Sequence, residues 1–272
     1  MTADLLTPFD LTGRIALVTG GTGGIGRACV ERLAAYGATV ALTCVEGIED
    51  PAKVLASFGN LPVSVHPLDL RDAASIRRCM AEVMARHDRI DVLVNNAAVG
   101  SATVAGFSGD PEAQDSAMLT INADGTLKMC QQFLVLPAAP GRKLINISSV
   151  GGGITVFPGF RLSDGMSKAA VAFLTRQLAA EAVHSETDVF AICPGATNTP
   201  MFQASTLSKL TPAGLSGFLA RLPKGRLIEP SEVAALVHFL ASPGSRVLHG
   251  AVLDASMGLG VRPGLMSEQA GH

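Results

Sequence analysis

The residues best suited to chemistry are a carboxylate and an ammonium four positions apart. Asp164 and Lys168 occur in the segment SDGMSK, at the start of a stretch with helical spacing. Residues at i and i+4 lie on the same face of a helix, so the spacing predicts two opposite charges near each other. An opposite charge within reach lowers the pKa of a carboxyl group. We therefore expect Asp164 to be ionised at neutral pH, close to Lys168 or a bound cation, and not to donate a proton.

Three interpretations of Asp164 follow from these surroundings. It can be structural, either as an ion pair with Lys168 or as a helix N-cap, where Ser163 and Asp164 are both favoured residue types. It can act as an acid if a closed, apolar pocket raises its pKa. Its carboxylate can also stabilise a cationic substrate such as an iminium, whose reduction needs no proton donor at the reacting carbon. In the last interpretation Asp164 stays ionised, which the positive charge of Lys168 favours, but the substrate must itself be positively charged.

A second candidate site is the glycine-rich segment ALVTGGTGGIGRACVERLAAYGATV. Gly20, Gly24 and Gly26 have the places that a dinucleotide-binding turn requires: a tight turn, close backbone approach to a pyrophosphate, and close packing at a helix N-terminus. Glycines also serve ordinary turns. Here the order of strand, turn, helix and strand favours binding of a nicotinamide dinucleotide, NAD or NADP.

Short β-rich runs alternate with helical stretches along nearly the whole chain. Helical spacing occurs at 24–36, 72–87, 112–135, 165–183 and 230–241, and the strand candidates are RIALVTG, ATVALTC, PVSVHPL, IDVLVNN, KLINISS, VFAICPG and GAVLDAS. This order predicts an α/β fold with a doubly wound, seven-stranded parallel sheet and helices on both faces. No repeat or linker divides the chain, so we expect one domain over 1–272. It includes a substrate-loop segment at about 197–226 and a flexible tail after 260.

The composition restricts the class of partner. The 272 residues are 48% apolar and 16% charged, with a net charge of −2, which gives no basic field for nucleic acid or an anionic membrane. The start MTADLL does not resemble a secretion signal, and no apolar run reaches the roughly eighteen residues of a membrane span. Five cysteines without a C-x-x-C pair and six dispersed histidines favour reduced core thiols and give no support for a metal site. We expect a cytoplasmic protein that acts on a small molecule.

Taken together, the motifs resemble those of the short-chain dehydrogenase/reductase family over about residues 9–260. The family pattern T-G-x-x-x-G-x-G is found at 19–26, NNAA at 95–98 is similar to its N-N-A-G turn, and INISSVGG is similar to the strand that ends in its catalytic serine. PGATNTPM at 194–201 resembles the loop that holds the nicotinamide, and GRLIEPSEVAALVHFLAS resembles the last helix. The resemblance implies a single-domain Rossmann fold and an NAD- or NADP-dependent oxidoreductase.

The resemblance also assigns roles to individual residues. Asn122, Ser149 and Lys168 match three members of the family's catalytic tetrad, and Asp164 occupies the position of the fourth. Lys168 is expected to hold the nicotinamide ribose, and Asp69 in LDL to contact the adenine. The implied cofactor contacts are Gly20, Thr22, Gly24, Ile25, Gly26, Asp69, Leu70, Asn95, Ala97, Lys168, Pro194, Gly195 and Thr199. In the family, helices matching 112–135 and 165–183 pack around a two-fold axis, which implies a homodimer or homotetramer.

Two departures from the family pattern matter. The family's proton donor is the tyrosine of Y-x-x-x-K, whereas the only tyrosine here, Tyr36, follows the first helix and lies far from a nicotinamide in this fold. The second strand ends in TCVEGIED, with neither an acidic residue at its tip nor a basic residue for a 2′-phosphate. Glu46 either reaches a ribose hydroxyl or is a solvated loop carboxylate, so the choice between NAD and NADP stays open.

The leading hypothesis is an oxidoreductase that reduces a C=N or C=O bond of a partly hydrophobic small molecule. The alternative is a non-redox pocket, as in a cyclase, isomerase or dehydratase, or an inactive subunit. Lys168, Asn122 and Ser149 favour a working pocket, while the missing tyrosine argues against ordinary alcohol dehydrogenation. The hydrophobic part of the substrate is inferred from apolar residues that would form a lid or would simply pack: Met201, Phe202, Leu207, Leu210, Leu215, Phe218 and Leu219.

Overall fold

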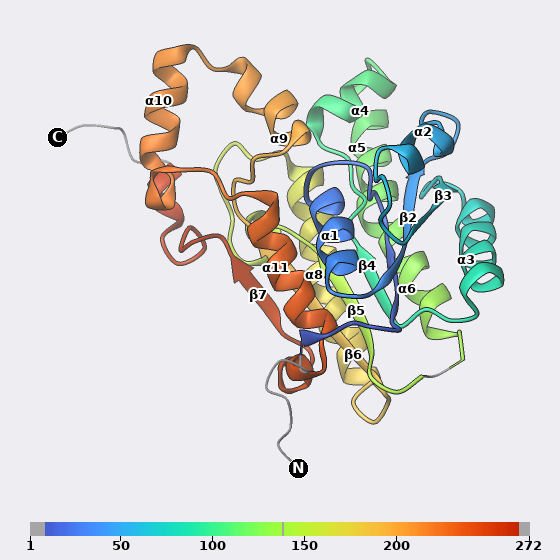
Figure 1. Ribbon diagram of the computed structural model, residues 1–272. Coiled ribbons are helices and arrows are strands. Elements are labelled where there is room, and N and C mark those ends of the chain that lie inside the picture. Colours follow the sequence, from blue (N-terminus) through green and yellow to red (C-terminus); the bar gives the residue numbers. More distant parts are fainter. Residues whose placement is uncertain (1–8, 138, 267–272) are drawn as a thin grey trace.

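The computed structural model describes residues 9–137 and 139–266, which form one seven-stranded parallel sheet (Figure 1). The strand order is β3-β2-β1-β4-β5-β6-β7. The strands are β1 (Ile15–Val18), β2 (Thr39–Val45), β3 (Val63–Leu68), β4 (Val92–Asn95), β5 (Arg142–Ile147), β6 (Thr187–Pro194) and β7 (Val252–Ala255). All seven predicted strands, the parallel sheet and the single doubly wound domain are therefore confirmed.

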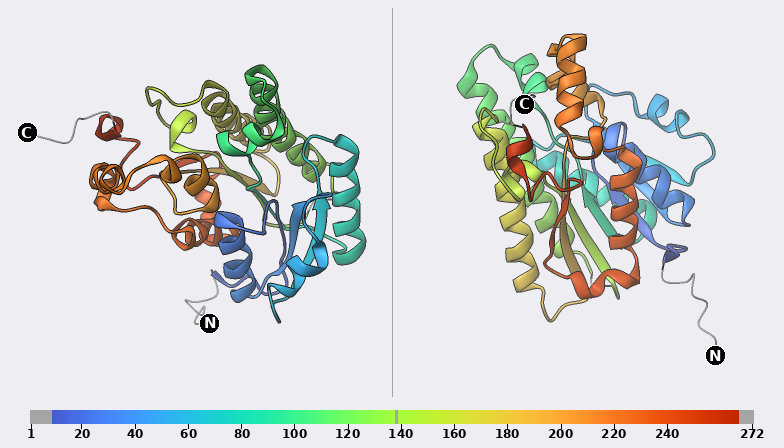
Figure 2. Two further views of the ribbon diagram at one scale, coloured as in Figure 1. Left: turned by 90° about the horizontal axis from the view of Figure 1, so that it is seen from above. Right: turned by 90° about the vertical axis from the view of Figure 1, so that its left-hand side faces the viewer.

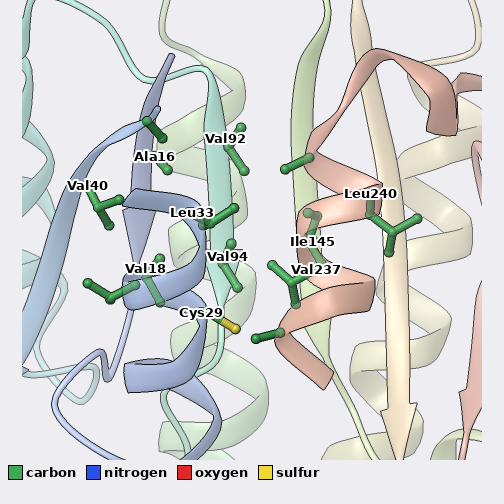
Figure 3. Close-up of a cluster of buried hydrophobic side chains, with 14 of the residues drawn as sticks. Ala16, Val18, Cys29, Leu33, Val40, Val92, Val94, Ile145, Val237 and Leu240 are labelled. Carbon is green, nitrogen blue, oxygen red and sulfur yellow. The ribbon is translucent and has the colours of Figure 1, made fainter. Parts of the chain in front are cut away.

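Helices cover both faces of this sheet (Figure 2). On one face, α1 (Gly24–Ala35) and α11 (Pro230–Ala241) pack through Cys29, Leu33, Val237 and Leu240 onto alternate residues of β1, β4 and β5 (Figure 3). On the other face, α3 (Ala73–His87), α6 (Thr126–Leu134) and α8 (Leu162–Glu181) pack onto the intervening residues. Both sides of the central strands are buried, which explains why their sequences are continuously apolar.

The stretch at 112–135, predicted as one helix, has three parts. It consists of α5 (Pro111–Leu119), a π-helical turn (Thr120–Gly125) and α6. A Cβ on Gly125 would lie 2.8 Å from the Leu70 Cβ, so only glycine lets the π-helical turn approach the end of β3 this closely. Inside a helix, a π-turn is often found at a functional position.

The segment 197–226 is helical rather than a loop. It forms α9 (Pro200–Ser205) and α10 (Pro212–Arg221), with 3-10 turns at Leu207–Lys209 and Pro223–Gly225. Leu207 and Phe218 lie in a small buried cluster, against which Phe202, Leu210, Leu215 and Leu219 pack. Most of the apolar residues expected in a lid therefore pack against one another. Met201 is the exception, with 43% of its surface exposed.

The remaining helices connect the strands around the ends of the sheet. They are α2 (Pro51–Ala56), α4 (Ser101–Phe107) and α7 (Val150–Gly153). Within the tail predicted to be flexible, Pro263–Met266 forms a 3-10 turn, and residues 267–272 lie outside the described part of the chain. No helix in the described part has the length and apolar character needed to cross a membrane.

Candidate active site

The predicted site residues gather at the carboxyl ends of β1, β3, β4, β5 and β6. Thr22 and Ile25 follow β1 in the glycine turn and the first turn of α1, Leu70 follows β3, and Pro194 is the last residue of β6. In doubly wound sheets, ligands bind at this edge because the loops diverge there and leave a crevice.

The glycine turn fits the pyrophosphate of a dinucleotide. Gly20 and Gly24 have positive φ angles of 62° and 53°, and a Cβ on Gly26 would lie 2.1 Å from the carbonyl oxygen of Gly20. Helix α1 begins after Gly23, whose position offers no side-chain cap, so the first amides of the helix are left for an anion. A Cβ on Gly24 would lie 3.2 Å from Cγ2 of Thr199, so the turn and the 194–201 loop lie side by side.

Three residues absent from the predicted site hold this turn in place. The amide nitrogen of the Asn96 side chain donates to the carbonyl oxygens of Thr19 (3.0 Å) and Gly20 (3.1 Å). The Thr19 hydroxyl accepts from the backbone of Asn96 and Ala97, and the Thr43 hydroxyl accepts from the backbone of Gly20 (3.0 Å). The motif NNAA could have indicated that Asn96 has a role in the turn. Thr43 lies on the neighbouring strand, and no sequence pattern indicated its role.

Asn95 points in the opposite direction from its neighbour. Its side chain is buried and donates to Oδ1 of Asn146 on the adjacent strand at 2.9 Å. The predicted contact between Asn95 and the cofactor is therefore not one that this side chain can make without leaving Asn146.

Asn122 lies in the π-helical turn and holds the loop after β4. Its Oδ1 accepts from the backbone nitrogen of Val99 at 2.8 Å, and its Nδ2 donates to the carbonyl oxygen of Val99 at 3.0 Å. Both ends of the side chain thus bind one backbone position. Asn122 fixes the wall of the crevice rather than presenting a free amide to it.

Ser149 caps the short helix α7, where its hydroxyl oxygen accepts from the backbone of Gly151 at 3.2 Å. This leaves the hydroxyl hydrogen free to donate. Gly152 follows with a φ of 92°, and a Cβ there would lie 2.2 Å from the carbonyl oxygen of Gly165. The turn that carries Ser149 therefore packs directly on the backbone next to Asp164.

Asp164 lies in the first turn of α8, and its carboxylate has no hydrogen-bond or ion-pair partner among the described residues. Lys168 is one turn further on, and within the described part of the chain its ammonium makes one long hydrogen bond, 3.4 Å, to the carbonyl oxygen of Ile147. The N-cap of α8 is Arg161, which makes no side-chain cap. Both structural interpretations of Asp164, the ion pair with Lys168 and the N-cap, are therefore wrong.

Burial controls the acidity of both groups. It raises the pKa of the Asp164 carboxyl above its usual value, although the positive charges of Lys168 and Arg161 act in the opposite direction. It also lowers the pKa of the Lys168 ammonium, which the nearby Asp164 carboxylate opposes. The expected lowering of the Asp164 pKa is therefore wrong, because loss of solvation outweighs an attraction that acts without direct contact.

Comparison with known proteins identifies the family. A family model described as Enoyl-(Acyl carrier protein) reductase matches residues 20–260. Oxidoreductase UcpA of Salmonella typhimurium is 35% identical over 248 residues, covering 88% of this chain and 92% of UcpA. The chain belongs to the short-chain dehydrogenase/reductase family. It is accordingly a short-chain oxidoreductase of a family that uses NAD or NADP.

Two further similarities are to a reductase and to a solved complex with NADP. The 3-oxoacyl-[acyl-carrier-protein] reductase FabG of Thermotoga maritima is 33% identical over 254 residues, covering 92% of this chain and 98% of FabG. A solved Pseudomonas aeruginosa RhlG/NADP active-site complex superposes with a TM-score of 0.80 at 30% identity, covering 93% of this chain and 99% of RhlG.

In this member of the short-chain dehydrogenase/reductase family, ion pairs hold the residues that follow β2 and β3. Both carboxylate oxygens of Asp69 accept from Arg71, at 2.7 to 3.1 Å, which lowers the pKa of Asp69. Glu46 accepts from the Ser75 hydroxyl at 2.5 Å and pairs with Arg78 at 2.5 Å. Glu46 is therefore neither a free ribose ligand nor an unpaired loop carboxylate. It ties the end of β2 to α3.

A second carboxylate fixes the start of α8 in this family member. Asp115 of α5 accepts from Nε of Arg161 at 2.7 Å and from the Ser163 hydroxyl at 2.6 Å. Arg161 also donates to the side-chain oxygen of Gln114 at 3.0 Å. The hydrogen bonds from Ser163 and Arg161 lower the pKa of Asp115. The backbone just before Asp164 is thus held in place, while no other described residue pairs with its side chain.

Proposed function

We propose that this protein is an NAD(P)-dependent reductase of cationic C=N compounds, with a partly hydrophobic iminium as its substrate class. The observation that carries the proposal is the Asp164 carboxylate, which stands at the family's tyrosine position without any partner from the described chain. A bound dinucleotide supplies the hydride. The chain supplies the binding surface and the charges around the acceptor carbon.

An iminium matches the charges at this position. A partly buried carboxylate without a partner is costly, and a cation held beside it recovers that cost. An imine bound next to Asp164 also gains a proton more readily, and the protonated form is the one that accepts hydride. Because the reacting carbon itself needs no proton, the missing tyrosine is not required for this reaction.

The other site residues support binding and orientation. The glycine turn and the N-terminus of α1 would hold the pyrophosphate, and Lys168 would hold the nicotinamide ribose. Ser149 has a hydroxyl hydrogen available for a polar group of the substrate, since its oxygen only accepts from Gly151. Asn122 keeps the loop after β4 in place through Val99.

A second candidate is carbonyl reduction with Asp164 as the proton donor. Burial raises the pKa of Asp164, which is the direction that this role needs. The two candidates differ in the protonation state they require, so one rate comparison separates them.

The test compares a cyclic iminium with the ketone of the same ring system, using the unmodified protein and Asp164→Asn. Removing the charge should reduce kcat/KM for the iminium about 10- to 100-fold, the effect of one charged hydrogen-bond partner, and should change ketone reduction far less. Asp164→Tyr should increase ketone reduction. Asp88→Asn, the same change at an exposed position after α3, is the control. Fast ketone reduction that Asp164→Asn abolishes would reject the iminium proposal in favour of the proton donor.

We further propose that the protein works in the cytoplasm as a homodimer or homotetramer. Along α8, three large apolar side chains are exposed: Leu162 (81%), Met166 (60%) and Phe173 (67%). A stripe of this kind is suited to burial against a second copy. Light scattering should give the mass of a dimer or tetramer, and Phe173→Glu should shift the species toward the monomer. A monomeric unmodified protein at micromolar concentration would reject this proposal.

A further inference from the structure

We infer a second ligand site, at the end of α1 opposite the glycine turn, that binds a small planar aromatic carboxylate. A cavity of about 680 Å³ opens there between the last turn of α1, the residues that precede β1, and α11. Helix α1 has 12 residues, so roughly 18 Å separate the two ends of the helix. Figure 1 shows α1 and α11 next to each other, and this cavity lies away from the crevice at the carboxyl ends of the strands.

Aromatic rings form the walls of the cavity. The ring centroids of Tyr36 and His238 are 3.9 Å apart, and the Phe9 ring lies 6.3 Å from the rings of both His238 and Phe239. Phe9 and Tyr36, which both line the cavity, each have 42% of their surface exposed. Nε2 of His238 lies 2.7 Å from the carbonyl oxygen of Phe9, and burial lowers the pKa of His238, which keeps it neutral. A lining made of ring surfaces favours a flat, apolar ligand body.

Arg32 supplies the charge that selects an anion. Its guanidinium lies 5.1 Å from the centroid of the Tyr36 ring, and its Nε is buried with no hydrogen-bond acceptor. No carboxylate among the described residues pairs with Arg32. The one acidic residue of the lining, Asp10, is held by the Thr12 backbone nitrogen at 3.0 Å and the Thr12 hydroxyl at 2.7 Å. A carboxylate on the ligand would satisfy Arg32 with the planar, two-point geometry that guanidinium prefers.

The floor of the cavity is preformed. Gly37 has a φ of 95°, and a Cβ there would lie 2.5 Å from the Thr12 hydroxyl oxygen. The backbone nitrogen of Leu11 donates to the carbonyl oxygen of Tyr36 at 2.8 Å. The segment before β1 is thus fastened to the end of α1. A cavity of this volume, apolar with a few placed polar groups, has the usual character of a small-molecule site, and a two-ring aromatic acid is of suitable size.

The composition of the chain provides a local reporter. Tyr36 is the only tyrosine, so labelling with ring-¹³C tyrosine gives signals from this cavity alone. Titration with 2-naphthoate should produce a saturable shift of the Tyr36 ring signals. 2-Naphthalenemethanol, which keeps the rings and lacks the charge, should bind at least about 10-fold more weakly. A naphthoate bound only in the catalytic crevice would leave the Tyr36 signals unchanged.

Two variants test the role of the charge. Arg32→Gln should weaken naphthoate binding at least about 10-fold, while Arg77→Gln, the same change at an exposed position of α3 outside the cavity, should leave it unchanged. The site is rejected by the absence of a saturable Tyr36 shift at millimolar naphthoate, by equal affinity for the alcohol, or by full affinity in folded Arg32→Gln. If circular dichroism shows that Arg32→Gln is unfolded, the comparison of acid and alcohol on the unmodified protein decides.

Discussion

The glycine turn and the start of α8 lie at the same edge of the sheet, but they use their polar groups in opposite ways. In the turn, the side chains of Thr19, Asn96 and Thr43 each form hydrogen bonds with backbone groups. At the start of α8, residues 9–137 and 139–266 offer the carboxylate of Asp164 no partner and the ammonium of Lys168 one long hydrogen bond. These side chains hold the turn in shape before a ligand arrives, and only the first amides of α1 are left for an anion. The start of α8 depends on bound molecules for its partners.

The same contrast holds between two carboxylates near the start of α8. Asp115 is bound by Arg161 and Ser163, which lower its pKa and join α5 to α8. Asp164, three residues after Arg161, is partly buried without such partners, and its pKa is raised. One carboxylate therefore stabilises the fold, while the other is kept at a cost in stability, as is common for groups that act on a ligand.

The largest expected effect is a loss of dinucleotide affinity when a substitution distorts the glycine turn. In Gly26→Ala, the new Cβ must displace the carbonyl oxygen of Gly20, which lies 2.1 Å from its position. We expect the affinity for NAD and NADP to fall about 10- to 100-fold or more, the cost of overpacking a tight contact. Calorimetric titration with both dinucleotides measures it. Gly106→Ala, where a Cβ meets open space, is the control, and unchanged binding by Gly26→Ala would contradict this account of the turn.

The next effect concerns the charge of Asp164 during turnover. A quaternary iminium keeps its charge at every pH, so its reduction should report the protonation of Asp164. Because burial raises the pKa of Asp164, the rate should begin to fall at a higher pH than an exposed aspartate would give, and should decrease about 10- to 100-fold on full protonation. Asp164→Asn should remove this dependence. A rate that rises on acidification would show that the protonated form is the active one.

The smallest expected effect is on the free energy of unfolding. Replacing Asp164 and replacing Asp115 should change it in opposite directions. The pKa of Asp164 is higher in the folded than in the unfolded chain, so its ionised form disfavours folding above its folded pKa, and this penalty disappears as the pH falls. At pH 7, Asp164→Asn should raise the free energy of unfolding by about 0.5–1 kcal/mol.

Asp115 should behave in the opposite way. Its pKa is lowered in the folded chain, so it contributes stability that is lost as the pH falls through that pKa, and Asp115→Asn should lower the Tm at pH 7. Urea unfolding of both variants at pH 7 and at acidic pH provides the measurement. If both changes destabilise the protein at pH 7, the distinction between the carboxylates is wrong.

Sequence patterns were sufficient to predict the strands and the glycine turn that position the site. The apolar runs located the central strands because strands buried on both faces need no polar alternation. The spacing of Gly20, Gly24 and Gly26 located the turn because two of these positions have positive φ angles and the third touches a backbone oxygen. A positive φ angle or a close contact within one turn depends on residues near in the chain. It therefore appears as a short pattern in the sequence.

Properties that depend on distant contacts were not accessible in this way. Burial outweighs the attraction of Lys168 in setting the pKa of Asp164, so the i, i+4 spacing alone gave the wrong direction. Thr43 and Glu46 acquire their roles from contacts with Gly20 and Arg78 on other elements. The helices of 197–226 are stabilised mainly by packing within their own small cluster, which spacing did not reveal because each helix is short.

The π-helical turn at Thr120–Gly125 makes this part of the chain sensitive to length as well as to residue type. A π-turn holds one residue more than the α-helix would need, so a single deletion there would convert 111–134 into a regular helix. Everything before the deletion would then rotate by about 100° relative to α6. That rotation would carry Asp115 away from Arg161 and turn Asn122 away from Val99. The extra residue thus sets the rotation of α5 relative to α6. It keeps both the contact of Asp115 with Arg161 and the contact of Asn122 with Val99 possible at once.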